Sequence, residues 1–226
     1  MSLQEQSREC PMCHRCSLEH TEAEINACWD AHLHNDYLEK VTRELRLSGR
    51  VSSQFGKHTF DKWVFDDEKQ KYKTLQECKE WHFSKDTALY LYGSCGTGKT
   101  FAARCILFQA MQGGNTVAEV TAYDLLKRAL RFEGMELTRQ YEAAKYLLID
   151  DFDKPNWDEK ATAYIWQLFN TRAENGGRTI LTSNFEPKNL RDIFAGQTGG
   201  NDTTVESMFQ RLHPVTSIEI AGTSRR

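Results

Sequence analysis

The sequence predicts an α/β protein with a central parallel sheet flanked by helices. Short apolar runs alternate with segments of helical apolar spacing along most of the 226 residues. One run leads into the glycine-rich segment 91–100, LYGSCGTGKT, which is followed by a helix. Another run ends in two carboxylates, Asp150 and Asp151. In open parallel sheets such groups gather where the strands end, so we expect one site at that edge.

Length and charge limit the classes of protein that need to be considered. The chain has room for one α/β core with a small appendage. A net charge of -3 excludes a strongly basic nucleic-acid binder, although a local basic stripe is compatible with it. No apolar run reaches 18 residues, and the start, MSLQEQSREC, has no apolar signal core. We therefore expect a cytoplasmic protein without membrane contact.

The N-terminal segment is rich in cysteine and histidine. Cys10 and Cys13 have the C-x-x-C spacing of a zinc-binding turn, and Cys28 and His32 would stand one helical turn apart. These four residues predict a Cys3His zinc site. The alternative ligands are Cys16 and His20, which share the i, i+4 spacing. Zinc would allow so short a segment to fold, whereas the other interpretation is a tail with reduced thiols and no metal.

A helix is predicted over 22–47, directly after this cluster. Its apolar residues recur near helical spacing at Ile25, Trp29, Leu33, Leu38, Val41 and Leu45. Ser48 and Gly49 then break the pattern. We place the domain boundary here, with a Cys/His-rich N-terminal domain over 1–48 and the α/β domain over 49–226.

The glycine-rich loop predicts a binding site for the phosphates of ATP or ADP. It matches GxxxxGK[ST] and lies between a buried strand at 88–92 and a helix at 101–112. Backbone N-H groups of 94–100 would surround the phosphates at the helix N-terminus, and the aromatic segment 52–79 would lie near the adenine. Lys99 would reach the outer phosphates and Thr100 would ligate Mg²⁺. The expected nucleotide-binding residues are Gly93, Ser94, Cys95, Gly96, Thr97, Gly98, Lys99, Thr100 and Phe101. The alternative is a simple glycine turn.

Polar residues after two later strands would complete this site. The strand at 146–149 ends in Asp150, the natural outer ligand of Mg²⁺, and Asp151, which could orient or deprotonate the attacking water. The strand at 178–182 leads to Asn184, whose amide could bond both the γ-phosphate and that water. The competing interpretations are a solvated turn before Pro155 for the two aspartates and an ordinary turn residue for Asn184.

The remaining elements continue the alternation of strands and helices. They are a strand at 117–120, helices at 123–131, up to 145 and at 161–173, a helix at 205–212 and a strand at 215–220. Arg211, near the end of the last helix, could project toward the γ-phosphate of a neighbouring subunit. An arginine on a helix is otherwise a solvated residue.

The ordered motifs FGKHTFDKW, LYGSCGTGKT, VAEVTAYDLLKRALR, YLLIDDFD, TILTSN, MFQRL and IEIAGTSRR resemble the DnaC/IstB-like AAA+ ATPases over about 50–226. This family comprises bacterial replicative helicase loaders and transposition helper ATPases. The resemblance implies ATP hydrolysis on an AAA+ core without a C-terminal helical lid. It also implies that Asn184 is sensor 1, Arg211 an arginine finger and Arg226 a second sensor.

The resemblance further implies an ATP-switched assembly factor, in the first place a helicase loader. Its N-terminal domain would grip the replicative helicase hexamer, and its subunits would associate through ATP at their interfaces. Single-stranded DNA would be contacted by Lys127, Arg128 and Arg131, unless these form a solvated basic face. The alternative is a transposition helper that binds DNA and recruits a transposase. A small-molecule kinase is more remote, since it would need an acceptor pocket and lid arginines that the sequence does not indicate.

Overall fold

The computed structural model describes residues 22–64, 68–129, 134–198 and 202–222. The chain divides into two compact units, Met1–Leu47 and Ser48–Arg226. In the first unit the described element is helix α1 (Glu22–Leu47). Within the described ranges, no helix combines the length and apolar character needed to cross a membrane.

A five-stranded parallel sheet forms the centre of the second unit. Its strands are β1 (Ala88–Tyr92), β2 (Val117–Thr121), β3 (Tyr146–Asp150), β4 (Arg178–Ser183) and β5 (Val215–Glu219). They are arranged in the order β2-β3-β4-β1-β5, and all neighbours are parallel. The predicted parallel sheet is therefore confirmed. Because β4 lies between β1 and β3, the segment that follows β4 emerges between the other two strand ends.

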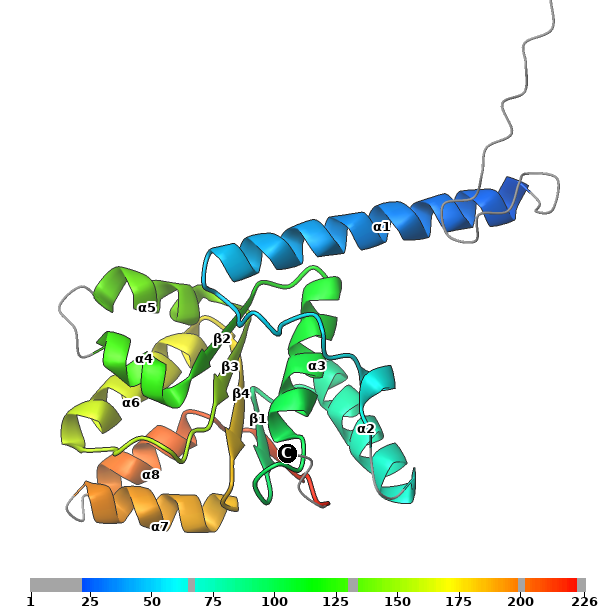
Figure 1. Cartoon of the computed structure of the whole chain (residues 1–226). Coiled ribbons are helices and arrows are strands. Elements are labelled where there is room, and N and C mark those ends of the chain that lie inside the picture. The colour runs from blue at the N-terminus through cyan, green and yellow to red at the C-terminus, as the bar shows by residue number, and fades with distance from the viewer. Residues whose placement is uncertain (1–21, 65–67, 130–133, 199–201, 223–226) are drawn as a thin grey trace, which may run out of the picture. The chain divides into compact units, whose positions relative to one another are not determined.

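Helices cover both faces of this sheet (Figure 1). One face carries α2 (Glu68–Phe83) and α3 (Lys99–Gln112). The other face carries α4 (Ala122–Ala129), α5 (Gly134–Ala143), α6 (Glu159–Glu174), α7 (Pro187–Gln197) and α8 (Asp202–Gln210). A short 3-10 helix, Phe60–Lys62, precedes α2.

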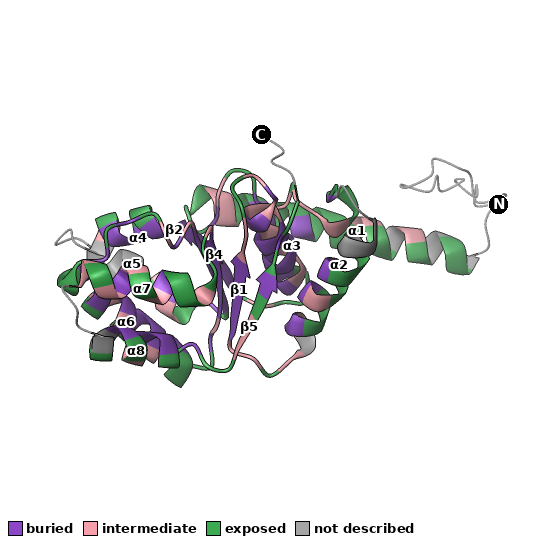
Figure 2. Cartoon of the chain, turned by 90° about the horizontal axis from the view of Figure 1, so that it is seen from below, coloured by how far each residue is buried: buried purple, intermediate pink, exposed green. Residues whose placement is uncertain are grey.

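The inner strands β1 and β3 are apolar on both faces because helices cover both faces of the sheet. Tyr90 and Ile149 belong to the core cluster that also contains residues of α4, α5, α6, α7 and α8. Leu89, Leu91 and Leu148 are equally buried, and since side chains alternate along a strand they face α2 and α3. Figure 2 shows the resulting buried interior along the strands. Such doubly covered strands read as continuous apolar runs, which is why the sequence located them.

Two helices are absent from the sequence-based description. Helix α2 turns Thr74, Cys78 and Trp81 inward, and this spacing was available within a mostly charged segment. Helix α7 begins with Pro187 in its first turn, a position where proline is favoured because its missing N-H costs no hydrogen bond. Both helices carry signals that sequence reasoning missed.

Helix α8 ends at Gln210 rather than at residue 212. Residues 211 to 213 form turn hydrogen bonds back to residues 208 to 210. Pro214 follows, and the residue before a proline is disfavoured in the helical conformation. Arg211 consequently lies in the turn after α8.

Candidate nucleotide-binding site

The loop between β1 and α3 depends on glycine at two positions. Gly93 has φ +143, and a Cβ there would lie 2.4 Å from the carbonyl oxygen of Ile220. Gly98, the residue that caps α3, has φ +103, and a Cβ there would lie 3.0 Å from Nε1 of Trp63. A side chain at either position would be both crowded and conformationally strained. The loop can therefore hold the start of α3 close to the sheet only with these glycines.

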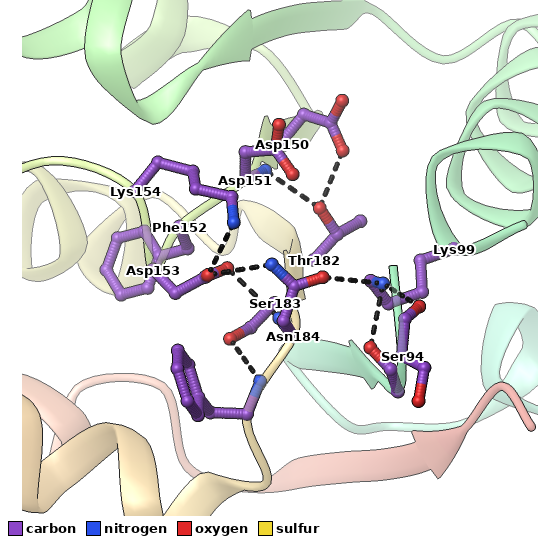
Figure 3. A network of polar contacts seen from close by, with 12 residues as sticks. Ser94, Lys99, Asp150, Asp151, Phe152, Asp153, Lys154, Thr182, Ser183 and Asn184 are labelled. Atoms are coloured by element: carbon purple, nitrogen blue, oxygen red, sulfur yellow. Dashed lines mark hydrogen bonds and ion pairs between the residues drawn. The ribbon is translucent and has the colours of Figure 1, made fainter. Parts of the chain in front are cut away.

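Lys99 is held above the loop by three acceptors (Figure 3). Its Nζ donates to the carbonyl oxygens of Gly93 and Ser94, both at 2.8 Å, and to Oδ1 of Asn184 at 3.0 Å. An ammonium has three donors, so all of them are used. Burial lowers the pKa of Lys99, while Cys95 and the three nearby aspartates oppose this change. A phosphate oxygen bound to Lys99 would take the place of one of the acceptors.

Asp150 and Thr100, the two predicted Mg²⁺ ligands, are brought together. Oδ1 of Asp150 accepts hydrogen bonds from Oγ1 of Thr100 at 2.8 Å and from Oγ1 of Thr182 at 2.6 Å. Asp150 ends β3 and Thr100 lies in the first turn of α3. A carboxylate next to a hydroxyl is an oxygen donor set that suits Mg²⁺, so these residues fit the metal.

Asp151 adopts a backbone conformation that is uncommon for residues other than glycine. Its φ is +55, and its N-H donates to Oγ1 of Thr182 at 2.9 Å. Aspartate tolerates this conformation better than most residues. Burial raises the pKa of Asp151, and the carboxylates of Asp150 and Asp153 raise it further. A carboxyl group with a raised pKa is better suited to accept a proton from water.

Asn184 is fixed by a third carboxylate, Asp153. The Asn184 N-H donates to Oδ1 of Asp153 at 3.0 Å, and its Nδ2 donates to Oδ2 at 2.9 Å. Nζ of Lys154 lies 3.3 Å from the same Oδ2, and the Asp153 side chain is only 1% exposed. Sequence reasoning missed Asp153 as a site residue, although Asp153 ends the motif YLLIDDFD. It also missed Thr182, which carries no signal that sets it apart from other strand residues.

A pocket of about 450 Å³ opens beside these groups. Its lining comprises His58, Cys95, Gly96, Gly98, Lys99, Thr100, Phe101, Asp151, Lys154 and Asn184. Gly93, Ser94 and Thr97 are outside this lining, and their carbonyl and hydroxyl groups instead hold the loop and Lys99. The pocket is thus polar where the phosphate loop, β3 and β4 meet.

An aromatic wall borders the pocket on the side of the segment before α2. The His58 ring meets the Phe101 ring edge-on at a centroid distance of 4.6 Å, and Trp63 lies 6.1 Å from Phe101. Burial, followed by the guanidinium of Arg104, lowers the pKa of His58 and so favours a neutral imidazole. A base or sugar that extends from the phosphate loop would meet neutral, largely apolar groups here.

Several predicted residues lie away from this pocket. Arg211 is exposed, and its guanidinium lies 5.7 Å from the centre of the Trp166 ring. Arg128 donates to the hydroxyl of Tyr141, whereas Lys127 is exposed. Arg131 and Arg226 lie outside the described residues.

The predicted zinc ligands lie only in part within the described structure. Cys28 and His32 lie on α1, where Nε2 of His32 is 3.4 Å from Oδ2 of Asp36. Cys10, Cys13, Cys16 and His20 precede the described residues. Among the residues that the structure describes, no group of three or more metal-binding side chains occurs.

Comparison with known proteins places this geometry in a family context. The family signature described as IstB-like ATP binding protein matches residues 15–226. The chain is 28% identical over 139 residues to the chromosomal replication initiator protein DnaA of Campylobacter fetus subsp. fetus. This match covers 59% of this chain and 32% of the relative. The chain thus spans about a third of that curated relative's length.

Two solved structures share the fold. The crystal structure of DnaI has a TM-score of 0.65 at 20% identity, and the match covers 80% of this chain and 100% of that one. The crystal structure of the DnaC helicase loader has a TM-score of 0.56 at 17% identity, with 74% and 99% covered. At these identities the likeness is one of fold.

Proposed function

Because this chain belongs to the IstB-like ATP-binding proteins, a family of AAA+ ATPases, we propose that it is an ATP-driven assembly factor of the helicase-loader type. The observation that carries the proposal is the meeting of Lys99, Asp150 and Asn184 at adjacent strand ends. Three separate segments of the chain would there address one triphosphate, since Lys99 and Asn184 line the pocket and Asp150 is hydrogen-bonded to Thr100, which also lines it.

The residues around the phosphates and the attacking water have distinct tasks in the proposed reaction. Lys99 binds the outer phosphates, and Thr100 and Asp150 would hold Mg²⁺, which would neutralise phosphate charge. Asp151 takes a proton from water as the water oxygen attacks the γ-phosphorus and the bond to the ADP oxygen breaks. The products are ADP and inorganic phosphate.

The site would be completed by a second subunit. Arg211 is exposed on the turn after α8 rather than directed into its own pocket, which supports a role at a neighbour's nucleotide. An arginine supplied from outside stabilises the charge that develops on the phosphoryl group. ATP would thus link subunits, and hydrolysis would release or reset the assembly.

The helicase-loader assignment is supported by how completely the structural matches cover the DnaI and DnaC chains. The matches extend over 100% of the DnaI chain and 99% of the DnaC chain. We propose that the Cys/His-rich N-terminal unit binds the replicative helicase hexamer and that the α/β unit contacts single-stranded DNA. Exposed Tyr123 and Lys127, one turn apart on α4, provide an aromatic face and a cation for such contacts, whereas Arg128 is engaged with Tyr141.

A transposition helper is the second candidate function. It is favoured by the family signature itself, which is that of IstB-like proteins. A loader binds the helicase hexamer and prefers single-stranded DNA, whereas a helper binds duplex DNA and recruits a transposase. Binding of the purified full chain with ATP to each DNA form, with and without a helicase hexamer, separates the two.

The ATPase proposal is tested by Lys99→Ala, with Lys160→Ala as the control. Lys160 is exposed on α6, away from the pocket lining. We expect Lys99→Ala to abolish Mg²⁺-dependent ATP binding in calorimetry while its circular dichroism spectrum stays that of the wild type. Lys160→Ala should bind ATP like the wild type. Unchanged ATP affinity in folded Lys99→Ala protein would refute the site.

A further inference from the structure

The amide of Asn184 has only one orientation that satisfies its neighbours. A carboxylate can only accept hydrogen bonds and an ammonium can only donate them. Nδ2 must therefore face Asp153, at 2.9 Å, and Oδ1 must face Lys99, at 3.0 Å (Figure 3). Amide orientations usually have to be assigned from the surrounding network, and here two charged neighbours decide it.

Asp153 holds the side-chain amide of Asn184 in this orientation. Its two oxygens are both engaged by Asn184, one by the backbone N-H and one by Nδ2. With 1% of its side chain exposed, Asp153 has little access to water that could replace those donors. Hydrogen bonds to an ionised acceptor are stronger than neutral ones, so the pair should keep its geometry when the groups around it change.

We propose that Asp153 is a positioning residue that makes Asn184 act through its oxygen. Because Nδ2 stays on Asp153, it is not available to the γ-phosphate. When a phosphate oxygen takes over a donor of Lys99, Oδ1 of Asn184 accepts a hydrogen bond from the attacking water and orients it toward the γ-phosphorus. Asp151, which lines the same pocket, takes the proton. The inference rests on the proposed ATPase function and specifies how its sensor works.

Asn184 could act by accepting a hydrogen bond from the attacking water through Oδ1 or by donating one to the γ-phosphate through Nδ2. Asn184→Ala removes both groups and cannot separate these two roles. Once a phosphate oxygen has taken over the Lys99 donor, Asp153→Asn lets the Asn184 amide turn either way, because asparagine both donates and accepts. In the exchange variant Asp153→Asn/Asn184→Asp, the new amide at position 153 would donate to one oxygen of the new carboxylate at position 184, while the other oxygen still faces Lys99. The charge of the pair is unchanged and an acceptor remains in place, but no amide donor remains at position 184.

The experiment measures hydrolysis at saturating ATP and the affinity for ATP in the full chain. We expect Asp153→Asn and Asn184→Ala each to lower hydrolysis about tenfold or more while ATP affinity stays within about threefold, since orientation rather than binding is lost. The double variant Asp153→Asn/Asn184→Ala should be no slower than Asn184→Ala alone. The exchange variant should exceed Asp153→Asn. Asp192→Asn, an exposed carboxylate change on α7, should match the wild type.

Two outcomes would overturn the proposal. An inactive exchange variant beside an active wild type would mean that Asn184 must donate to the γ-phosphate. Additive losses in the double variant would mean that Asp153 does not act through Asn184. Urea unfolding of the same variants without nucleotide tests the pairing separately: the exchange variant should have a higher midpoint than Asp153→Asn. A wild type without hydrolysis would refute the proposed function, while the midpoints would still decide whether the two residues are paired.

Discussion

Thr182→Val should destabilise the protein by removing one buried oxygen. Thr182 is 0% exposed, and its hydroxyl donates to Asp150 at 2.6 Å and accepts from the N-H of Asp151 at 2.9 Å. Valine keeps the shape but leaves that N-H without its acceptor, which costs about 1–3 kcal/mol. The lost bond to a charged group contributes about 1.5–3 kcal/mol. Because Asp150 keeps its bond from Thr100, we expect a total loss of about 2–4 kcal/mol in the free energy of unfolding.

Thr162→Val is the matched control. Thr162 is also 0% exposed, but its hydroxyl makes one longer bond, 3.3 Å, to the carbonyl oxygen of Trp157. We expect it to lose about 1 kcal/mol or less in urea unfolding without nucleotide. Thr182→Val should also weaken Mg²⁺-dependent ATP binding, because Asp150 is no longer held in place, whereas Thr162→Val should not.

The comparison of the two threonine variants can refute the reasoning. Equal free energies of unfolding for Thr182→Val and Thr162→Val would mean that the hydroxyl bridge between the ends of β3 and β4 adds nothing to stability. An unchanged Mg²⁺ dependence in Thr182→Val would mean that Asp150 does not need this bridge to hold the metal.

Three further predictions concern proton binding, subunit contacts and zinc. The raised pKa of Asp151 means that the folded state binds its proton more tightly than the unfolded state, so ionised Asp151 lowers stability above that pKa. Asp151→Asn should therefore raise the free energy of unfolding at pH 7. Urea titrations at decreasing pH should show this gain vanish near pH 3.8, the ordinary pKa of an aspartate. Mixing inactive Asp151→Asn and Arg211→Ala proteins should restore some hydrolysis, because a mixed assembly contains interfaces with both groups intact; no recovery at assembling concentrations would contradict the shared site. Metal analysis of reduced, chelator-free protein should find one Zn²⁺ per chain, and Cys13→Ser should lose it while still binding ATP; a zinc content near zero would remove that site.

Local sequence patterns were sufficient for the elements that carry the phosphate loop. The loop between β1 and α3 must be glycine-rich to adopt its backbone angles and to pass close to Ile220 and Trp63. Strands β1 and β3 could be located because both faces of the sheet are covered, which makes these strands almost continuously apolar. Such constraints act over a few neighbouring residues, so they leave a mark in the sequence.

Helices α2 and α8 show where local reasoning weakens. Helix α2 is largely charged and turns only a narrow stripe inward, so its pattern is faint. Helix α8 ends two residues before its apolar pattern does, because the chain turns toward Pro214.

The sequence by itself determined the phosphate loop, the two carboxylates at the end of β3 and the parallel sheet that carries them. Only the tertiary structure decided that β4 lies between β1 and β3, which places Asn184 against Lys99 and Asp153 across 85 and 31 positions of the chain. The same strand order brings the Thr182 hydroxyl within hydrogen-bonding distance of the Asp150 carboxylate and the Asp151 N-H. The physical reason is that strand order follows from how helices and strands pack together in space, whereas local patterns record only whether a residue is buried and which conformation it prefers.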